Sequence, residues 1–141
     1  MDINLLQSQL NQLWASTLER LAVDLCAHSI SMDIIVKAKN DKHYQVIFEG
    51  VSSLYFVSGE GDARFDEPPW DYAEISEFYY QAEGINQIAY QHLTKKMMPQ
   101  YRSSANFVLE LWSSALFIEA KSVVINGERF EVGYPRITNG L

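Results

Sequence analysis

The dipeptide Asn126-Gly127 is the sequence feature that most constrains how this chain can fold. A two-residue β-turn of type I′ needs a positive φ at both central residues, and Asn-Gly is the pair that most favours it. Apolar residues precede the turn at 123–125 and a strand-like segment follows it at 128–130. The turn therefore predicts a hairpin with three opposed pairs: Ile125 with Glu128, Val124 with Arg129, and Val123 with Phe130.

The residues before this hairpin alternate as strands do. Phe107, Leu109 and Leu111 share one face of a predicted strand, while Glu110 points to the other. A second alternation follows over residues 115–120. The stretch 106–134 therefore predicts a β-meander that ends in the hairpin, and most of the core is expected to pack against it.

An amphipathic helix is predicted near the N-terminus, from Ile3 to about Ala15. Asp2 can cap it, because its carboxylate can accept a hydrogen bond from a free N–H group of the first turn. The apolar face of this helix has the expected spacing and comprises Leu6, Leu10, Leu13 and Trp14.

Strand-like alternation fills much of the remaining chain. Further strands are predicted at residues 30–38, 44–48, 51–58 and 75–82, with a polar turn at 39–42 and a bend at Gly50. Residues 18–27 and 85–96 fit helical and strand patterns alike, and for the first we favour a strand over 20–27. The predicted fold class is α+β, with the N-terminal helix packed on a predominantly antiparallel, β-rich sheet or sandwich that ends in the β-meander.

Length and cysteine content limit the possible classes of protein. The 141 residues predict a single globular domain over 1–141. The single cysteine, Cys26, cannot form an internal disulfide, which favours the cytoplasm over secretion. Residues 1–12 lack the pattern of a signal peptide, and no apolar run is long enough to span a membrane.

The negative charge is concentrated in one segment. Residues 60–83 contain eight acids and one base, Arg64, so this segment accounts for the whole net charge of −7. Nucleic-acid binding needs clustered Lys and Arg at the phosphates, so the charge argues against direct contact with nucleic acid. It favours a basic protein partner instead.

The sequence offers no catalytic, cofactor-binding or metal-binding constellation. His28, His43 and His92 have no second His, Cys or acid at a metal-ligand spacing. Cys26 lacks the cationic neighbours, other than His28, that would activate a thiol. The triplet 59–61 is a Gly-x-Gly without a third glycine, and its acidic neighbours would repel phosphate. We therefore expect no enzymatic activity, no cofactor and no metal.

Aromatic residues are interleaved with the acids of the segment broken by Pro68-Pro69. Rigid aromatic side chains supply binding energy at protein interfaces, and acids steer a basic partner. The candidate partner-binding residues are Glu60, Asp62, Phe65, Asp66, Glu67, Trp70, Asp71, Tyr72, Glu74 and Glu77. A plainer interpretation is also open, in which the aromatics point into the core and the acids only keep the surface hydrated.

Two segments resemble the YxiG-like family of small Bacillus proteins. The first is YQVIFEGVSSLYF, residues 44–56, which contains an F-x-G-V run. The second is NFVLELWSSALFIEAKSVVING, residues 106–127. The likeness extends over residues 31–56 and 106–132 and includes no catalytic motif.

The resemblance implies a role beside a polymorphic toxin. Small acidic proteins of this kind are encoded next to such toxins, including the wall-associated WapA-type toxins that attack tRNA, and act as immunity proteins. The resemblance thus implies a protein that binds and neutralises a basic toxin domain in the cytoplasm, without catalysis and without contact with nucleic acid or membrane. The alternative is a small-ligand-binding domain or a degenerate enzyme.

Overall fold

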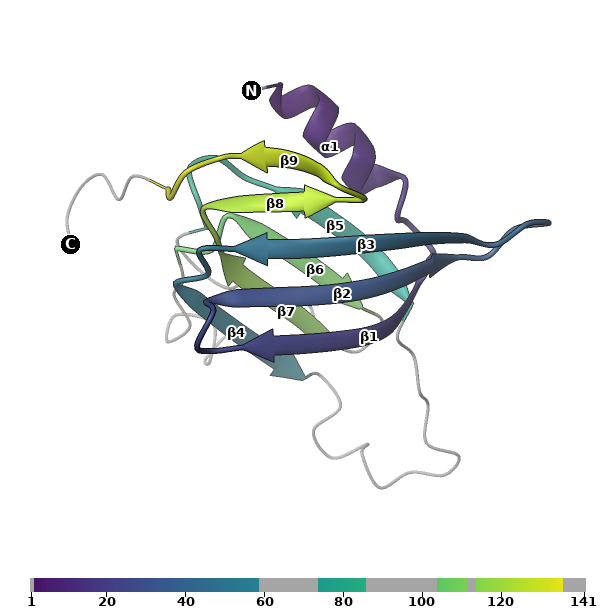
Figure 1. The fold of residues 1–141 in the computed structure, drawn as a ribbon, viewed down its shortest axis with the longest axis horizontal. Helices are drawn as coiled ribbons and strands as arrows, with labels where there is room; N and C mark the ends of the chain where they lie inside the picture. The colour runs from purple at the N-terminus through teal and green to yellow at the C-terminus, as the bar shows by residue number, and fades with distance from the viewer. Residues whose placement is uncertain (1, 59–73, 86–103, 112–113, 136–141) are drawn as a thin grey trace, which may run out of the picture.

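Residues 2–58, 74–85, 104–111 and 114–135 are described by a computed structural model, in which they form two antiparallel β-sheets and one helix. The five-stranded sheet, in front in Figure 1, has the order β1-β2-β3-β8-β9. The four-stranded sheet behind it has the order β4-β7-β6-β5. The bounds are α1 Ile3–Asn11, β1 Thr17–Asp24, β2 Ser29–Val36, β3 Lys42–Glu49, β4 Ser53–Ser58, β5 Ile75–Tyr80, β6 Phe107–Leu111, β7 Ser114–Glu119, β8 Ser122–Ile125 and β9 Glu128–Glu131.

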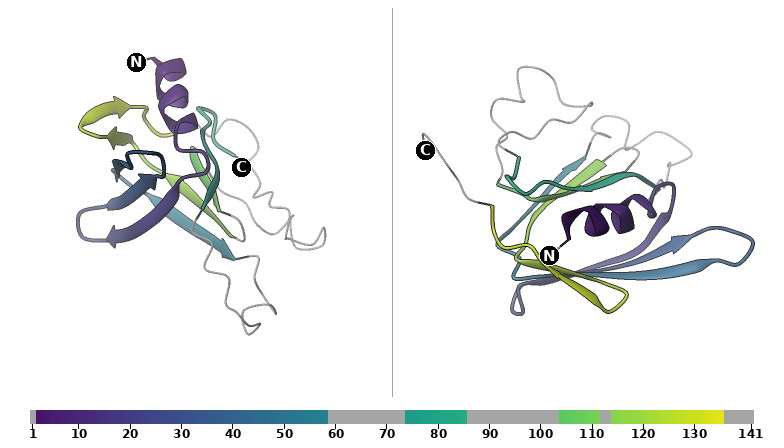
Figure 2. Two further views of the ribbon diagram at one scale, coloured as in Figure 1. Left: turned by 90° about the vertical axis from the view of Figure 1, so that its right-hand side faces the viewer. Right: turned by 90° about the horizontal axis from the view of Figure 1, so that it is seen from above.

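The α+β prediction is wrong, because the described residues form a β-sandwich with one short helix. The predicted β-meander does not remain in one sheet: β6 and β7 belong to the four-stranded sheet, while β8 and β9 belong to the five-stranded one. The two sheets bury their apolar faces against each other, so neither needs a layer of helices. Helix α1 lies at one side of the sandwich instead of covering a sheet face (Figure 2).

The hairpin predicted from Asn126-Gly127 is confirmed. Both residues have positive φ, +48° and +85°. The register is the predicted one, with three opposed pairs: Ile125 with Glu128, Val124 with Arg129, and Val123 with Phe130. This part of the fold follows from local turn chemistry alone.

The chain passes between the sheets at two points that lie against each other. Gly50 leads from β3 to β4, and Lys121 leads from β7 to β8. The Lys121 N–H donates to the Glu49 carbonyl at 3.0 Å, and the Ser52 N–H donates to the Glu119 carbonyl at 2.9 Å. Gly50 has a φ of +62°, and a Cβ added to it would lie 2.8 Å from the Lys121 Cβ. The two crossings therefore fit together only with glycine at this position.

A buried amide fastens the second crossing. Asn106, which precedes β6, is 0% exposed. Its Nδ2 donates to the carbonyls of Ala120, at 2.9 Å, and Gly133, at 3.3 Å, while its Oδ1 accepts from the Ala120 N–H at 3.0 Å. One side chain thus holds the end of β7 and the segment after β9 in place. Because its polar groups are hydrogen-bonded, it can be buried without a large desolvation penalty.

Aromatic contacts join the sheets at the centre of the core. The ring centroid of Phe48, on β3, lies 5.0 Å from that of Phe107, on β6, and 6.1 Å from that of Phe78, on β5. Phe107 also contacts Tyr80, at 5.1 Å. Aromatic pairs of this kind contribute about 0.5–1.5 kcal/mol beyond their buried area. Phe48 therefore connects the five-stranded sheet to two strands of the other sheet.

Helix α1 closes the side of the sandwich formed by β5 and β9. Leu6, Leu10 and Leu13 are fully buried there. The Gln7 side chain donates through Nε2 to the Phe78 carbonyl at 3.2 Å and accepts through Oε1 from the Tyr80 N–H at 3.0 Å. This amide binds the outer edge of β5 as a neighbouring strand would, and so covers an edge that could otherwise pair with another chain.

The N-terminal helix is shorter than predicted. It ends at Asn11, and residues 12–15 form a turn. Ala15 has a φ of +61°, and its N–H donates to the Ile75 carbonyl at 2.8 Å. The backbone after the helix is thus used to bind β5. As a result Trp14, predicted on the buried face, is 70% exposed.

Of the two ambiguous segments, the structure decides one. Residues 17–24 form the strand β1, so the preference for strand over helix is confirmed, but the predicted bounds of 20–27 are wrong because residues 25–28 form a turn. Residues 86–96 of the second segment lie outside the described ranges. The cap predicted at Asp2 is present, with Oδ1 accepting from the Leu5 N–H at 3.1 Å.

We predict that Gly50→Ala lowers the free energy of unfolding by about 2–4 kcal/mol, because the left-handed φ and the clash with Lys121 both oppose a Cβ. Gly127→Ala is the matched control, since it shares the positive φ but has nothing within 4 Å of its Cβ. This control should lose only about 1 kcal/mol. Denaturant unfolding measures both changes, and equal losses would contradict the tight fit of the crossings.

We also predict that Asn106→Leu costs about 2–4 kcal/mol, because it leaves the buried N–H and carbonyl of Ala120 without their partner. The exposed loop residue Asn40 offers a control, and Asn40→Leu should change stability by less than about 0.5 kcal/mol. Chemical denaturation of the two variants provides the comparison. A similar small effect for both would show that the amide does not hold the crossing.

Candidate functional site

The structure places two of the ten candidate partner-binding residues, Glu74 and Glu77. The other eight, Glu60, Asp62, Phe65, Asp66, Glu67, Trp70, Asp71 and Tyr72, lie outside the described residues. Glu74 is exposed and forms a β-bridge with Thr17, at the point where β5 meets β1. Glu77 is exposed on β5. The described part of the candidate surface therefore begins just before β5 and continues along that strand.

A β-bulge determines the direction of the Glu77 side chain. Ile75 is opposite Leu111, but Glu77 is opposite Glu110, so Ser76 is the extra residue of the bulge. The Ser76 hydroxyl donates to the Glu110 carbonyl at 3.1 Å. Without the extra residue, Glu77 would share the inward face with Ile75, which is fully buried. The bulge therefore moves Glu77 to the outer face of the four-stranded sheet.

We use the name acidic pair for Glu77 and Glu110. Tyr79, two residues after Glu77 on β5, is close enough to feel both charges. The two carboxyl groups come from directly opposed residues of β5 and β6 and are hydrogen-bonded to each other. Burial, the hydrogen bond to Glu77 and the charge of Glu77 raise the pKa of Glu110 to about 7. Burial and the charges of Glu110 and Glu77 raise the pKa of Tyr79 to about 12. Near neutral pH the pair can therefore hold one proton between two oxygens, while the phenol remains neutral.

Glu110 is not among the candidate site residues that the sequence predicts. Its outward direction followed from the alternation of Phe107, Leu109 and Leu111, and this direction is confirmed because those three side chains belong to the buried core. The missing information was the register of β6 against β5. A pattern within one strand gives the face of a residue, but not which residue of the next strand lies beside it.

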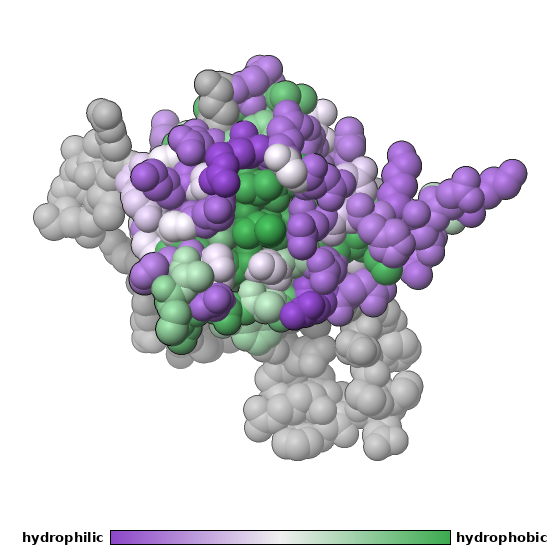
Figure 3. Space-filling model, viewed as in Figure 1, coloured by the Kyte–Doolittle hydropathy of each residue, from purple (hydrophilic) through white to green (hydrophobic). Residues whose placement is uncertain are grey.

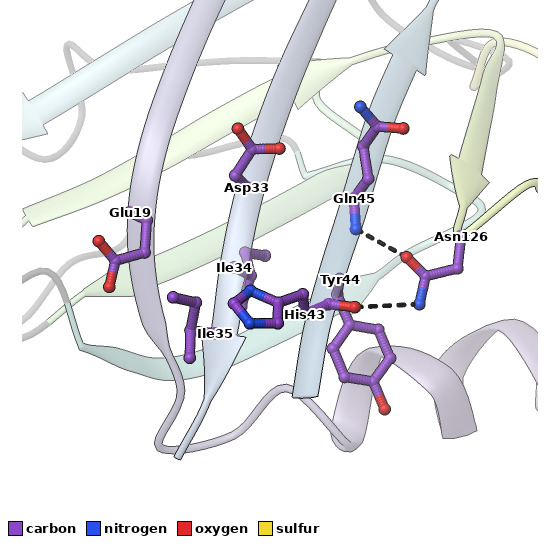
Figure 4. Close-up of a pocket in the computed structure, with 8 residues that line it drawn as sticks. All are labelled: Glu19, Asp33, Ile34, Ile35, His43, Tyr44, Gln45 and Asn126. Carbon is purple, nitrogen blue, oxygen red and sulfur yellow. Dashed lines mark hydrogen bonds between the residues drawn. The ribbon is translucent and has the colours of Figure 1, made fainter. Parts of the chain in front are cut away.

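A second feature is a groove of about 340 Å³ on the five-stranded sheet (Figure 4). It is lined by Glu19, Asp33, Ile34, Ile35, His43, Tyr44, Gln45 and Asn126. Ile35 and His43 are opposed on β2 and β3, with Glu19 beyond Ile35. The Asn126 side chain accepts from the Gln45 N–H at 2.7 Å, so the hairpin turn forms one end of the groove.

The outer face around this groove is largely hydrophilic, with a hydrophobic strip in the middle of the sheet (Figure 3). Ile47 and Val124 are half-buried and opposed in register on β3 and β8. At the polar margin, Arg129 forms an ion pair with Glu49, and the Ser122 hydroxyl also contacts Glu49, at 3.4 Å. The lining of the groove thus combines two separate carboxylates, an imidazole and two amides with the apolar side chains of Ile34 and Ile35.

Neither feature has the geometry of a metal centre. Among the residues that the structure describes, no three His, Cys, Asp or Glu side chains come together in a way that could hold a metal ion. Glu77 and Glu110 supply two carboxyl groups, and one proton between them reduces their affinity for a cation. The arrangement can instead present negative charge and hydrogen-bond acceptors to a partner.

The family comparison agrees with the two sequence segments considered first. The model of the YxiG-like protein family matches residues 6–130. The chain belongs to the YxiG-like family. It is 28% identical over 104 residues to the uncharacterized protein YxiG of Bacillus subtilis (strain 168). The aligned region covers 72% of each of the two chains. The predicted family is confirmed, and the matched region begins within α1 and ends within β9.

Within the described part of this YxiG-like chain, no helix has both the length and the apolar character needed to cross a membrane.

The raised pKa of Glu110 predicts how stability depends on pH. A carboxyl group with a raised pKa keeps its proton longer in the folded than in the unfolded chain, so its contribution is favourable at low pH and is lost as the pH rises from about 4.5 to about 7. Glu110→Gln removes this loss and keeps a donor for Glu77. Because Glu110 is only half-buried, we expect the variant to gain about 1 kcal/mol over the wild type between pH 5 and pH 8.

The measurement is denaturant unfolding at both pH values. The exposed Glu131, on β9 of the other sheet, supplies the matched control, and Glu131→Gln should follow the wild-type curve. Parallel pH curves for Glu110→Gln and the wild type would contradict a shared proton at the acidic pair.

Proposed function

We propose that this chain is an immunity protein that binds a basic toxin domain and neutralises it without catalysis of its own. The observation that carries the proposal is the charge distribution: the whole net charge of −7 comes from residues 60–83, in a segment that also contains Phe65, Trp70 and Tyr72. Acidic and aromatic side chains in one segment suit a surface that attracts a basic protein and then anchors it.

The described residues support the proposal at the end of this segment. Glu74 and Glu77 are exposed, and Glu110 extends the acidic surface onto β6. Glu77 and Glu110 stand on paired strands of a sandwich, and Glu74 forms a β-bridge just before β5, so these residues need little further ordering when a partner binds. A preorganised surface loses less conformational entropy on association, which favours tight binding.

The mode of inhibition we propose is competition by charge. A nuclease domain carries Lys and Arg to bind the phosphates of its substrate. An acidic surface on the immunity protein is attracted to the same basic groups and can occupy them in place of the nucleic acid. This function requires the cytoplasm of the producing cell, where the toxin would act, and requires neither a cofactor nor direct contact with nucleic acid or membrane.

We predict that reversing the charge at Glu74 and Glu77, both to Lys, slows association with the toxin domain about tenfold at low salt. Charge reversal at Asp66, Glu67 and Asp71 should also slow association with the toxin domain. The difference should shrink at high salt, because exposed charges are screened beyond a Debye length. Stopped-flow or surface-plasmon measurements with a catalytically inactive toxin domain give the rates.

The matched control reverses an equally exposed acid on the opposite sheet, Glu131→Lys, and should leave the association rate unchanged. Co-expression with the active toxin domain encoded beside this chain adds a cellular test, scored as survival. Unchanged rates and full protection after all the charge reversals would remove the acidic segment from the interface. Failure of the wild-type chain to protect against that toxin would remove the immunity function itself.

The groove on the five-stranded sheet supports the alternative, a small-ligand-binding domain or a degenerate enzyme. Its volume of about 340 Å³ is at the small end of ligand sites, and its polar groups include Glu19, Asp33 and His43. This alternative expects a metabolite to raise the melting temperature. It also expects a substitution in the groove, such as Asp33→Asn, to abolish that rise while the acidic reversals leave it intact.

A further inference from the structure

The edge strands at the two sides of the sandwich differ in what covers them. Helix α1 covers the edges of β5 and β9, whereas β1 and β4 are the terminal strands of their sheets at the side away from the helix (Figure 1). The N–H of Val51, just before β4, donates to the carbonyl of His28 in the β1–β2 turn, at 2.8 Å, which places the two edge strands near each other. Several apolar side chains are exposed on this second side.

Side chains that face inward along β1 and β4 are exposed. Leu21 and Val23 are opposed to the buried Met32 and Ile30 of β2, so all four share the inward face of the five-stranded sheet. Yet Val23 is 44% exposed. Phe56, opposed to the buried Leu116 of β7, is 60% exposed. Inward-facing apolar side chains at an edge remain in water unless another chain continues the sheet.

The outer edge of β1 also has little pairing within the part of the chain that the structure describes. β1 pairs with β2 on one side, and on its other side the described residues contribute a single bridge, between Thr17 and Glu74. From Arg20 to Asp24 the outer N–H and carbonyl groups therefore face no described strand. Such an edge can accept a further strand through main-chain hydrogen bonds.

The charges on β1 identify the occupant. Arg20 and Asp24 lie on the outer face, on either side of Ala22, and the part of the chain that the structure describes contains no ion pair to Arg20. We propose that a second copy of this chain pairs antiparallel along β1, with Ala22 of both copies on the two-fold axis. This register places Arg20 of each copy opposite Asp24 of the other, and Leu21 opposite Val23.

Self-pairing satisfies several requirements at once. The sequence Arg-Leu-Ala-Val-Asp has a positive charge at one end and a negative charge at the other, at equal distances from the central alanine. A two-fold axis through that alanine therefore creates two identical ion pairs. The same axis joins the inward faces, so the exposed Leu21 and Val23 of both copies form one apolar row. The resulting sheet continues across the dimer and has no free β1 edge.

This inference does not depend on the proposed immunity function. The paired residues lie on β1, whereas the acidic pair lies on β5 and β6 of the other sheet. Dimerisation through β1 would leave Glu77 and Glu110 accessible in both copies. An immunity protein of this form would present two acidic surfaces.

The first experiment is sedimentation velocity of the wild type and of two charge variants, Arg20→Glu and Asp24→Lys. The wild type should dimerise with increasing concentration. Each variant alone places like charges opposite each other twice, and its dimer dissociation constant should rise by about tenfold. An equal mixture of the two variants restores both ion pairs and should recover dimers. Lys39→Glu, in the exposed β2–β3 turn, makes the same charge change as Arg20→Glu and should leave dimerisation unchanged.

Asp24 also accepts hydrogen bonds from the N–H groups of Cys26 and Ala27 in its turn, so Asp24→Lys carries a risk for folding. A disulfide test avoids that risk. In a Cys26→Ser background, Ala22→Cys should form a disulfide-linked dimer on mild oxidation, because the two positions meet on the axis. Ser31→Cys, opposed to Ala22 one strand further in, should not. A wild type that remains a monomer, equal behaviour of the two cysteine variants, or a mixture that fails to recover dimers would each overturn the proposal.

Discussion

The contact between the two chain crossings determines the arrangement of this fold. A sandwich made from one chain needs strands that change sheets, and here both changes occur at one place, where Gly50 lies against Lys121. The Asn106 amide holds the backbone of Ala120, just after β7, and the Tyr134 hydroxyl donates to the Gly50 carbonyl at 2.7 Å. A buried amide such as that of Asn106 specifies one geometry, because each misaligned alternative leaves a hydrogen-bonding group without a partner. The packing of Phe48 on Phe107 then follows from the distance at which the crossings hold the sheets.

The sequence predicted those features whose causes are local. The hairpin at Asn126-Gly127 depends on the φ angles of two residues, and the helix cap depends on Asp2 and the first turn. The sandwich depends on contacts between residues distant in the chain, such as Gly50 with Lys121, which no alternation of apolar residues reveals. An unbroken meander and a meander divided between two sheets have the same periodicity, so the pattern over 106–134 could not separate them.

The candidate site shows the same limit on a smaller scale. The sequence showed the composition of the acidic segment and predicted the outward direction of Glu110. The pairing of Glu110 with Glu77 was not, because it requires the extra residue at Ser76 that reverses the face of everything after it in β5. Eight of the ten predicted contact residues lie outside the described ranges, so the structure informs the proposal through Glu74, Glu77 and their neighbours.

The Gln7 amide that binds the edge of β5 has a consequence for the order of folding. Gln7 contacts Phe78 and Tyr80, and Gln9 contacts Glu128 at 2.6 Å, so the first helix depends on strands that are synthesised much later. Contacts of such high sequence separation slow folding, since the loop between them must close before any stabilisation is gained. During synthesis the amphipathic N-terminal segment therefore remains without Phe78 and Tyr80 until β5 has left the ribosome, and without Glu128 until β9 has done so. Until Gln7 binds the edge of β5, that edge is open to non-native pairing, and chaperone binding to the N-terminal segment or to β5 would favour a correct product.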